Sequence, residues 1–210
     1  MKKTYRKQYF RALAQYIEVR FDMSASDAAA LTAAIKEALG TDVTMHTAEA
    51  YAEKLRAFLP RHQAENGFQI ITGDAARAAA EYAAKTAYKE TDAATYQAME
   101  ALVHNLNTMN SRAGAQVPFS SLNYGTDTSP EGRMAVHNLL RATEAGLGDG
   151  ETPIFPVQIF KVKEGVNYNE GDPNYDLFRH ALRCSAKRLF PNFSFLDAPF
   201  NLQYYKPGDY

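Results

Sequence analysis

The chain has very few of the residues on which cross-linked and metal-bound folds depend. Its 210 residues include one cysteine, Cys184, and no tryptophan. A single thiol excludes an internal disulfide framework, and it also excludes a zinc or iron–sulfur site built from several cysteines. We therefore expect a protein of a reducing compartment.

A charge excess of one sign and a long hydrophobic run are missing as well. The 23 lysines and arginines nearly balance the 24 aspartates and glutamates, so no overall field attracts nucleic acid or an anionic membrane. No apolar run approaches the length of a bilayer span, and the basic N-terminus lacks the apolar stretch of a secretory signal. These absences predict a cytoplasmic protein with no membrane or direct nucleic-acid partner.

The first part of the chain, to residue 90, is rich in alanine and in charged residues at helical spacing. This pattern predicts helices that are separated by breaks at Gly40, Pro60 and Gly73. Ser26 and Asp74 are the expected N-caps, because their side-chain oxygens can accept hydrogen bonds from free backbone amides. The predicted helices span residues 5–19, 26–39, 46–58 and 74–88.

The second half alternates between helical and extended patterns. Ser129-Pro130 and Asp172-Pro173 have the composition of helix starts, and Gly146 or Gly148 is expected to end the helix that begins at Ser129. Strands that alternate with helices favour a parallel sheet with the helices packed outside it. The predicted order is a helix over 92–109, an extended segment over 117–122, a helix from 129, a strand over 152–162, a helix from 172 and a strand over 190–196.

A polar loop in the segment from Asn105 to Gly125 is the clearest functional signal. Arg112 can form two hydrogen bonds to a phosphate or a base edge, Asn110 and Gln116 can read donors and acceptors, and Gly114 permits close backbone approach. In the equally compatible alternative, Arg112 pairs with a neighbouring carboxylate and the amides satisfy the loop's own backbone. The candidate binding residues are Asn110, Ser111, Arg112, Gly114 and Gln116.

The other chemistry-bearing residues favour structural roles. Cys184 lies near the apolar face of a helix with no histidine placed as its base. The glycines at 146, 148 and 150 follow a helix and precede a strand, whereas nucleotide-binding glycines follow a strand and open a helix. The histidines are scattered one per element, so we predict no metal site. They are His46, His62, His104, His137 and His180.

Several runs closely resemble the anaerobic, class III ribonucleoside-triphosphate reductases. The resemblance is strong in the second half of the chain and weak in the first. Its order and its number of matching runs make it highly specific. The runs are TYQAMEALVHNLNTM (95–109), SRAGAQVPFSS (111–121), TEAGLG (143–148), GETPIFP (150–156), DPNYD (172–176) and AKRLFPNF (186–193).

The resemblance implies an α/β fold that is part of the ten-stranded barrel of the glycyl-radical enzymes. The chain would be a single partial domain, with a helical segment at 1–91 and a helix–loop–strand and barrel segment at 92–210. The loop at 110–116 would lie between the allosteric specificity site and the substrate base, and the preceding helix would belong to a dimer interface. Possible barrel-lining residues are Ser120, Asn192 and Asn201.

The resemblance also implies an activity, the reduction of ribonucleoside triphosphates to deoxyribonucleoside triphosphates by radical chemistry for DNA synthesis. ATP and deoxynucleotides would act as effectors and formate as the reductant, and a radical-SAM enzyme would activate a homodimer. The glycyl radical and a zinc site would lie outside this segment. Cys184 does not match the family's Met-Gly-Cys-Arg segment, which we expect beyond Tyr210.

We therefore expect an internal piece of the reductase, without a catalytic residue of its own and inactive alone. A free-standing, non-catalytic nucleotide-binding or dimerisation module is the alternative that the sequence leaves open.

Overall fold

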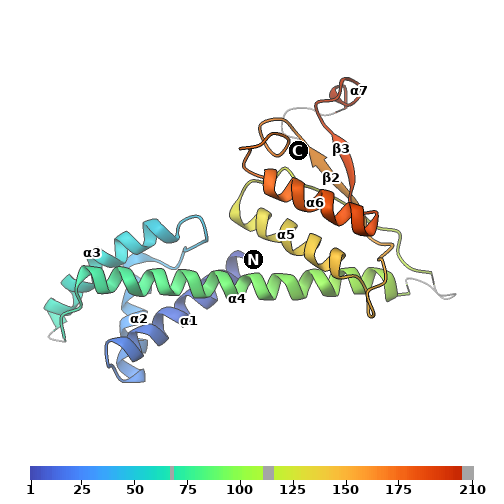
Figure 1. Ribbon diagram of the computed structural model, residues 1–210. Coiled ribbons are helices and arrows are strands. Elements are labelled where there is room, and N and C mark those ends of the chain that lie inside the picture. Colours follow the sequence, from blue (N-terminus) through green and yellow to red (C-terminus); the bar gives the residue numbers. More distant parts are fainter. Residues whose placement is uncertain (67–68, 111–115, 205–210) are drawn as a thin grey trace. The chain divides into compact units, whose positions relative to one another are not determined.

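A computed structural model (Figure 1) describes residues 1–66, 69–110 and 116–204. The chain divides into two compact units, Met1–Ala93 and Ala94–Tyr210, and the boundary falls inside helix α4 (Gly73–Thr108). Within the described ranges, no helix combines the length and apolarity that a membrane span requires.

The first unit is built from helices around one apolar core. Large side chains of three helices fill this core, including Tyr9, Leu13 and Leu55, which are all completely buried. The first part of α4 contributes alanines, whose small size lets neighbouring helices approach closely. The buried alanines of α4 are Ala76, Ala79, Ala80, Ala83 and Ala87. The other helices are α1 (Lys2–Arg20), α2 (Ala25–Leu39) and α3 (Ala48–Asn66).

The predicted break at Pro60 is wrong, and so is the prediction of two separate helices over 74–109. Helix α3 continues through Pro60, because Leu59 and Gln63 on either side of it are buried and their burial outweighs one lost backbone hydrogen bond. The helices predicted at 74–88 and 92–109 form the single helix α4. Its buried face runs on without interruption through Thr91 and Thr95, and no proline or glycine follows Gly73 within it.

The predicted N-caps of the first unit also need correction. Ser24, not Ser26, caps α2, since its Oγ accepts a hydrogen bond from the N–H of Asp27 at 3.1 Å. Asp74 lies within the first turn of α4. Thr72 accepts from the N–H of Ala75 at 3.2 Å instead.

The second unit is an α/β arrangement with a small parallel sheet, as predicted. The strand order is β1-β2-β3, and both pairs are parallel. Two helices link consecutive strands and lie over the sheet (Figure 1). The described residues form three strands, so the structure does not show the expected ten-stranded barrel. The elements are β1 (Ser121–Tyr124), α5 (Pro130–Ala145), β2 (Val157–Val162), α6 (Tyr175–Arg188), β3 (Asn192–Phe195) and α7 (Pro199–Leu202).

The boundaries of these elements follow local chemistry. Ser129 caps α5 as predicted, with its Oγ accepting from the N–H of Gly132 at 3.0 Å, and Gly146 ends that helix with φ +85°. Helix α6 starts at Tyr175, later than predicted, with Asn174 in place of Asp172 at its N-cap. Strands β1 and β2 also start later than predicted, because prolines lie in the segments before them and have no N–H to donate to a ladder.

Candidate functional site

Asn107, in the last turn of α4, binds the segment that leads into β2. Its Nδ2 donates to the carbonyl oxygen of Val103 at 2.7 Å and to that of Phe155 at 2.6 Å. Its Oδ1 accepts from the backbone N–H groups of Ile154 and Phe155 at 2.9 and 3.0 Å. The amide therefore uses its donors and acceptors within the chain, so Asn107 positions the approach to β2 and does not face a ligand.

The candidate binding loop begins just beyond this contact. Asn110 follows the end of α4 and Gln116 lies on the far side of the loop, and both residues are exposed. Ser111, Arg112 and Gly114 lie outside the described residues. The structure thus shows the two flanks of the loop and ties the helix before it, through Asn107, to the sheet.

The sheet has two unlike faces. On one face, Tyr124, Phe160 and Phe193 pack against residues of α5 and α6 in a buried cluster. The strand register and the alternation of side chains place the intervening residues on the opposite face. This opposite side, which we call the open face, carries mainly polar side chains that are all at least partly exposed. Its residues are Ser121, Asn123, Val157, Ile159, Lys161, Asn192 and Ser194.

Buried polar groups on the helix-covered face are linked by hydrogen bonds between the sheet and α5. The hydroxyl of Tyr124 donates to Oε1 of Gln158 at 2.6 Å, and Nε2 of Gln158 donates to Oγ1 of Thr143 at 2.8 Å. Burial, followed by the charge on the neighbouring Cys184 thiolate, raises the pKa of Tyr124 far above its usual value. Tyr124 therefore remains a protonated donor at neutral pH and acts as part of the scaffold.

Cys184 behaves as a packed side chain. It is fully buried in the cluster between α5, α6 and the sheet. Burial raises the pKa of its thiol to about 11, Glu144 adds to the rise, and Arg188 and Lys187 oppose it. This environment suppresses the thiolate and agrees with the structural role predicted from the sequence.

Two buried asparagines hold the loops at the carboxyl ends of β1 and β2. Nδ2 of Asn167 donates to the carbonyl oxygens of Gly125 at 3.0 Å and Lys161 at 2.9 Å. Nδ2 of Asn174 donates to the carbonyl oxygens of Gly125 at 3.1 Å and Asp127 at 2.8 Å. Gly125 has φ +120°, and a Cβ there would lie 2.8 Å from the carbonyl oxygen of Lys161, so glycine is required at this junction.

Arg133 extends this network towards the start of α6. Its Nη1 donates to Oδ1 of Asn174 at 2.8 Å, and it also contacts the carbonyl oxygen of Pro173. Its Nη2 donates to Asp176 at 2.7 Å. Partial burial acts to raise the pKa of Asp176, but the hydrogen bond and charge of Arg133 outweigh it and lower that pKa. The polar groups of this network form hydrogen bonds with one another, so we assign them a structural role.

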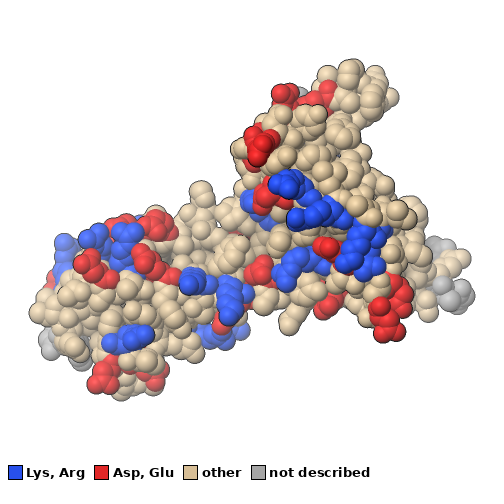
Figure 2. All heavy atoms as spheres, viewed as in Figure 1, with Lys and Arg blue, Asp and Glu red and all other residues tan. Residues whose placement is uncertain are grey.

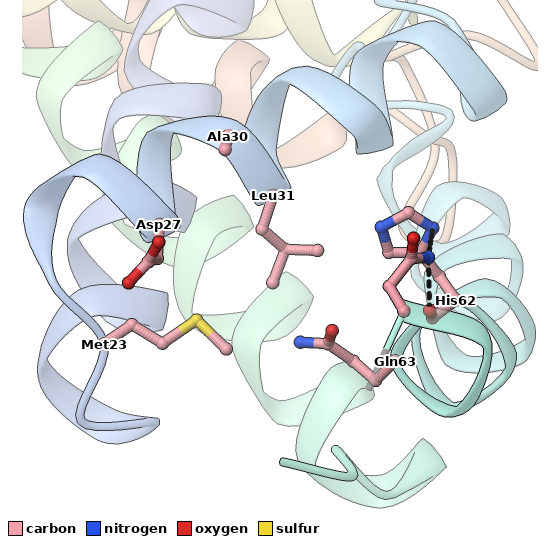
Figure 3. A pocket seen from close by; sticks show the side chains of 7 residues that line it. Met23, Asp27, Ala30, Leu31, His62 and Gln63 are labelled. Carbon is pink, nitrogen blue, oxygen red and sulfur yellow. Dashed lines mark hydrogen bonds between the residues drawn. The ribbon is translucent and has the colours of Figure 1, made fainter. Parts of the chain in front are cut away.

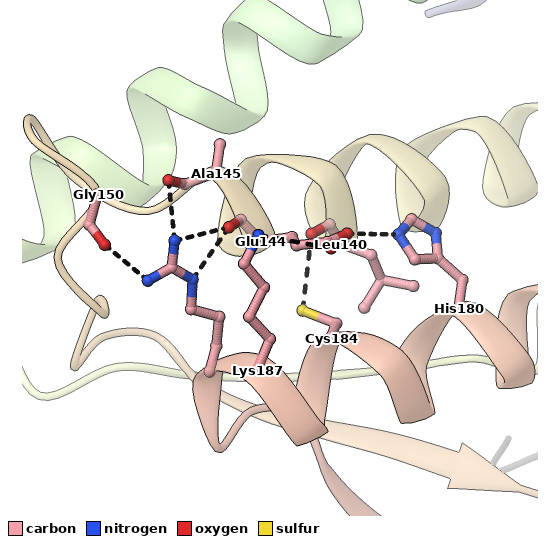
Figure 4. Close-up of polar contacts among 8 residues, drawn as sticks. Leu140, Glu144, Ala145, Gly150, His180, Cys184 and Lys187 are labelled. Carbon is pink, nitrogen blue, oxygen red and sulfur yellow. Dashed lines mark hydrogen bonds and ion pairs between the residues drawn. The ribbon is translucent and has the colours of Figure 1, made fainter.

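Arg188 joins the end of α5 to the end of α6 (Figure 4). Its guanidinium donates to the carbonyl oxygens of Glu144 at 2.8 Å, Ala145 at 3.1 Å and Gly150 at 2.6 Å. These acceptors include carbonyls that a helix end leaves without intrahelical partners. Figure 2 shows lysine and arginine side chains gathered over α6 on the same unit. Arg188, at the end of α6, caps the neighbouring helix α5.

The carboxylate of Glu144 receives two further groups from α6. His180 Nε2 lies 3.4 Å from one carboxylate oxygen, and Lys187 Nζ lies 3.7 Å from the other. The rings of His137 and His180 are 5.3 Å apart, a proximity that the sequence spacing did not reveal. In the part of the chain that the structure describes, no group of three metal-ligating side chains is suited to hold a metal ion.

The three predicted barrel-lining residues lie in different settings. Asn192 is exposed on the open face, opposite Ile159 in the strand register. Ser120 precedes β1, and its hydroxyl is buried without a hydrogen-bond partner among the described residues. Asn201 donates from Nδ2 to the carbonyl oxygen of Phe195 at 2.8 Å, which holds the turn between β3 and α7. The structure thus brings Asn192, of the three, onto the open face.

A small cavity in the helical unit is a weaker candidate (Figure 3). It encloses about 130 Å³, whereas sites for ligands of drug size usually enclose about 300–1,000 Å³. His62 at its edge stacks on Phe58 with ring centroids 5.0 Å apart, and Asn66 donates to the backbone carbonyl of His62 at 2.8 Å. These contacts favour a packing role. The lining residues are Met23, Asp27, Ala30, Leu31, His62, Gln63 and Asn66.

A sequence model described as anaerobic ribonucleoside-triphosphate reductase matches residues 40–210. The chain belongs to this reductase family. The match begins inside the helical unit and includes the whole sheet, so it covers both faces of the candidate site. The predicted membership of an oxidoreductase family is confirmed.

Curated relatives of the same name match about half of the chain. The anaerobic ribonucleoside-triphosphate reductase of Escherichia coli K12 is 39% identical over 98 residues, which are 46% of this chain and 14% of the relative. The enzyme of that name from Enterobacteria phage T4 is 41% identical over 107 residues, or 50% of this chain and 18% of the relative. The matched part of the chain therefore covers less than a fifth of the length of these reductases.

The runs that carry the similarity to the reductases hold several of the scaffold contacts. Asn107, Asn174 and Arg188 each lie in one of these runs, and each binds backbone carbonyls of another segment. Sequence reasoning assigned none of them such a role. The available signal was a single asparagine or arginine next to a loop, but the distant backbone partner of such a side chain is apparent only in the folded chain.

Proposed function

We propose that residues 94–210 form part of the substrate-enclosing wall of an anaerobic ribonucleoside-triphosphate reductase. The observation that supports this proposal is the contrast between the two faces of the sheet. One face is sealed beneath α5 and α6, while the open face presents hydroxyl, amide and ammonium groups. In an α/β barrel the helices surround the strands and the other side of each strand points inwards. The open face would then line the interior of a ten-stranded barrel.

On this proposal, the side chains of the open face bind and orient the substrate. Asn123 and Ser194 offer hydrogen-bond donors and acceptors suited to ribose hydroxyls, and Lys161 offers a cation suited to a phosphate. Asn192 is part of this wall, Ser120 would lie beside it just before β1, and Asn201 would hold the turn after β3. The chain supplies positioning groups, and the radical chemistry belongs to parts of the reductase outside it.

The loop at 110–116 would select the nucleotide. The exposure of Asn110 and Gln116 on its flanks supports this proposal, as does the family membership of the chain. Arg112, with Ser111 and Gly114, would contact a nucleotide's phosphate or base edge. Helix α4, which leads into the loop, would contribute to a homodimer interface.

The wider setting follows from the family and is proposed on that basis. The complete enzyme would reduce ribonucleoside triphosphates in the cytoplasm under the control of ATP and deoxynucleotide effectors. Formate would supply the reducing equivalents, and a radical-SAM activating enzyme would install the glycyl radical. This radical and a zinc site would lie outside the chain, which would be inactive alone as a single partial domain.

A chimeric enzyme tests the proposal. The segment of the Escherichia coli reductase that aligns with this chain is replaced by the chain's own residues, and reduction of the four ribonucleoside triphosphates is measured. We expect a working enzyme. In it, Arg112→Ala is expected to change the relative kcat/KM values for the four substrates by about tenfold or more, since one charge-assisted hydrogen bond contributes roughly 1.5–3 kcal/mol.

Arg183→Ala, an exposed arginine on α6, serves as the control and is expected to leave substrate preference unchanged. A folded, dimeric chimera that reduces no nucleotide would overturn the proposal and favour a non-catalytic binding or dimerisation module. An unchanged preference in Arg112→Ala with lowered stability would assign Arg112 to the scaffold.

A further inference from the structure

The helical unit contains a basic groove that the proposed function does not use. The groove lies between α1 and α2, which pack side by side (Figure 1), is open to solvent, and has a volume of about 640 Å³. Its volume is within the range of sites that bind small molecules, roughly 300–1,000 Å³. The cationic side chains that line it are Lys3, Arg6, Lys7, Arg11 and Lys36.

Helical spacing explains why these cations gather. Lys3, Lys7 and Arg11 follow one another at intervals of four residues along α1, so they lie on the same face of that helix. Lys36 reaches this face from α2, where its Nζ lies 5.0 Å from the centre of the Phe10 ring. The groove therefore concentrates positive charge from two helices around one space.

The charge of the groove is only partly balanced within the chain. Arg6 pairs with Asp42 at 2.6 Å, and Arg11 pairs with Glu90. The side chain of Asp42 is 88% exposed, so solvent weakens that pair considerably. Among the described residues, no ion pair joins a carboxylate to the three lysines, and the five cations face two acids. Three positive charges are thus left for a ligand.

A buried hydrogen-bond donor in the wall of the groove favours binding of an anionic ligand. Nε of Arg6 is buried and has no hydrogen-bond partner among the described residues. Leaving such a donor unpaired is unfavourable. An anion with several oxygens bound in the groove would offer this donor an acceptor.

Among the described residues that line the groove, no aromatic face is exposed for a nucleobase to stack on. Stacking on exposed aromatic faces is a common way for proteins to bind bases. The aromatic ring in the wall, that of Phe10, is 6% exposed and already lies beneath Lys36. We infer that the groove binds the triphosphate chain of a nucleoside triphosphate, or inorganic triphosphate, through its cations and without selecting the base.

The test measures binding by calorimetry to the whole 210-residue chain at low ionic strength. Inorganic triphosphate, ATP and dGTP are expected to bind with affinities within about threefold of one another, and the affinity should fall as salt is added, because the contacts are ionic. Adenosine, which has no phosphate, should not bind. Binding of nucleotides with no binding of inorganic triphosphate would point to a base-reading site and overturn the inference.

Matched charge variants localise the site. Combined Lys3→Gln, Lys7→Gln and Lys36→Gln should weaken triphosphate binding by about threefold to a hundredfold, because three ionic contacts to the ligand are lost. The control, combined Lys2→Gln, Lys54→Gln and Lys85→Gln, removes the same charge from exposed positions that do not line the groove. Circular dichroism checks that both variants remain folded.

Several outcomes would overturn the inference. They are an equal loss of affinity in the control, no binding of triphosphate by the folded chain, and tighter binding of a short oligonucleotide than of triphosphate. All are measured without reductase activity, so failure here is distinct from failure of the proposed function.

Discussion

At the scale of single residues, the polar side chains near the candidate loop divide into groups that hold the backbone and groups that remain exposed. Asn107 is the clearest of the first kind, because its amide makes four hydrogen bonds within the chain. Asn110, only three positions further on, is exposed. Residue type and position in the sequence did not distinguish the two roles.

Asn107→Ala is expected to lower the free energy of unfolding by about 1–3 kcal/mol, since it leaves backbone donors before β2 without their acceptor. Asn105→Ala is the matched control, because Asn105 is exposed on the same helix and its change should cost less than about 0.5 kcal/mol. Urea denaturation of the two variants measures the difference. Equal stabilities would show that the Asn107 contact contributes little.

The reactivity of Cys184 should depend on pH in a defined way. Its thiol pKa is raised from 9.0 to about 11, so at pH 8 the folded protein should react with iodoacetamide roughly a hundredfold more slowly than the urea-unfolded chain. The raised pKa stabilises the folded state fully below pH 9, and this contribution is lost as the pH rises towards 11. Mass spectrometry measures the rate of Cys184 labelling across this pH range. Rapid labelling of the folded protein at pH 7 would contradict the raised thiol pKa.

At the scale of elements, the ends of helices and strands depended on contacts more than on local composition. The start of α5 was predicted correctly from Ser129-Pro130, because an N-cap and its helix are neighbours in the sequence. The continuation of α3 through Pro60 was missed. Local propensity argues against a proline there, but burial of neighbouring side chains keeps the helix intact.

The link between α5 and α6 gives a prediction at this scale. Arg188→Ala removes the hydrogen bonds to carbonyl oxygens at the end of α5 and in the turn after it, so we expect a loss of about 1–3 kcal/mol in unfolding free energy. Amide hydrogen exchange should accelerate in residues 145–151 in particular. Arg183→Ala on the same helix is exposed and should change neither quantity.

At the scale of the whole molecule, the described sheet presents β1 and β3 as edge strands. Exposed apolar residues lie next to it, such as Phe119 at 83% and Leu189 at 80% exposure. Open edges beside apolar side chains favour self-association. We expect the isolated chain to associate or aggregate as its concentration rises.

Phe195→Lys, placed on the edge strand β3, is expected to reduce this association, because charged edge residues discourage strand pairing. Val19→Lys adds the same charge at an exposed position of α1 and should have little effect. Sedimentation velocity over a range of concentrations makes the comparison. A monodisperse monomer at every concentration would contradict the prediction.

The sequence by itself determined the family, the alternation of helices and strands in the second half, and the direction of strand pairing. These properties follow from local sequence runs and periodicities, which can be recognised without the folded structure. Parallel pairing, for example, follows from the helices between β1, β2 and β3, because a chain that crosses over through a helix returns in the same direction.

Only the tertiary structure decided which polar residues hold the scaffold and where charge is concentrated. Asn107 meets Phe155 across 48 positions of the sequence, and Arg188 meets Glu144 across 44. The basic groove likewise needs α1 and α2 side by side before its cations share one space. Such contacts depend on packing between distant segments, and no local pattern of residues encodes the partner that each side chain will meet.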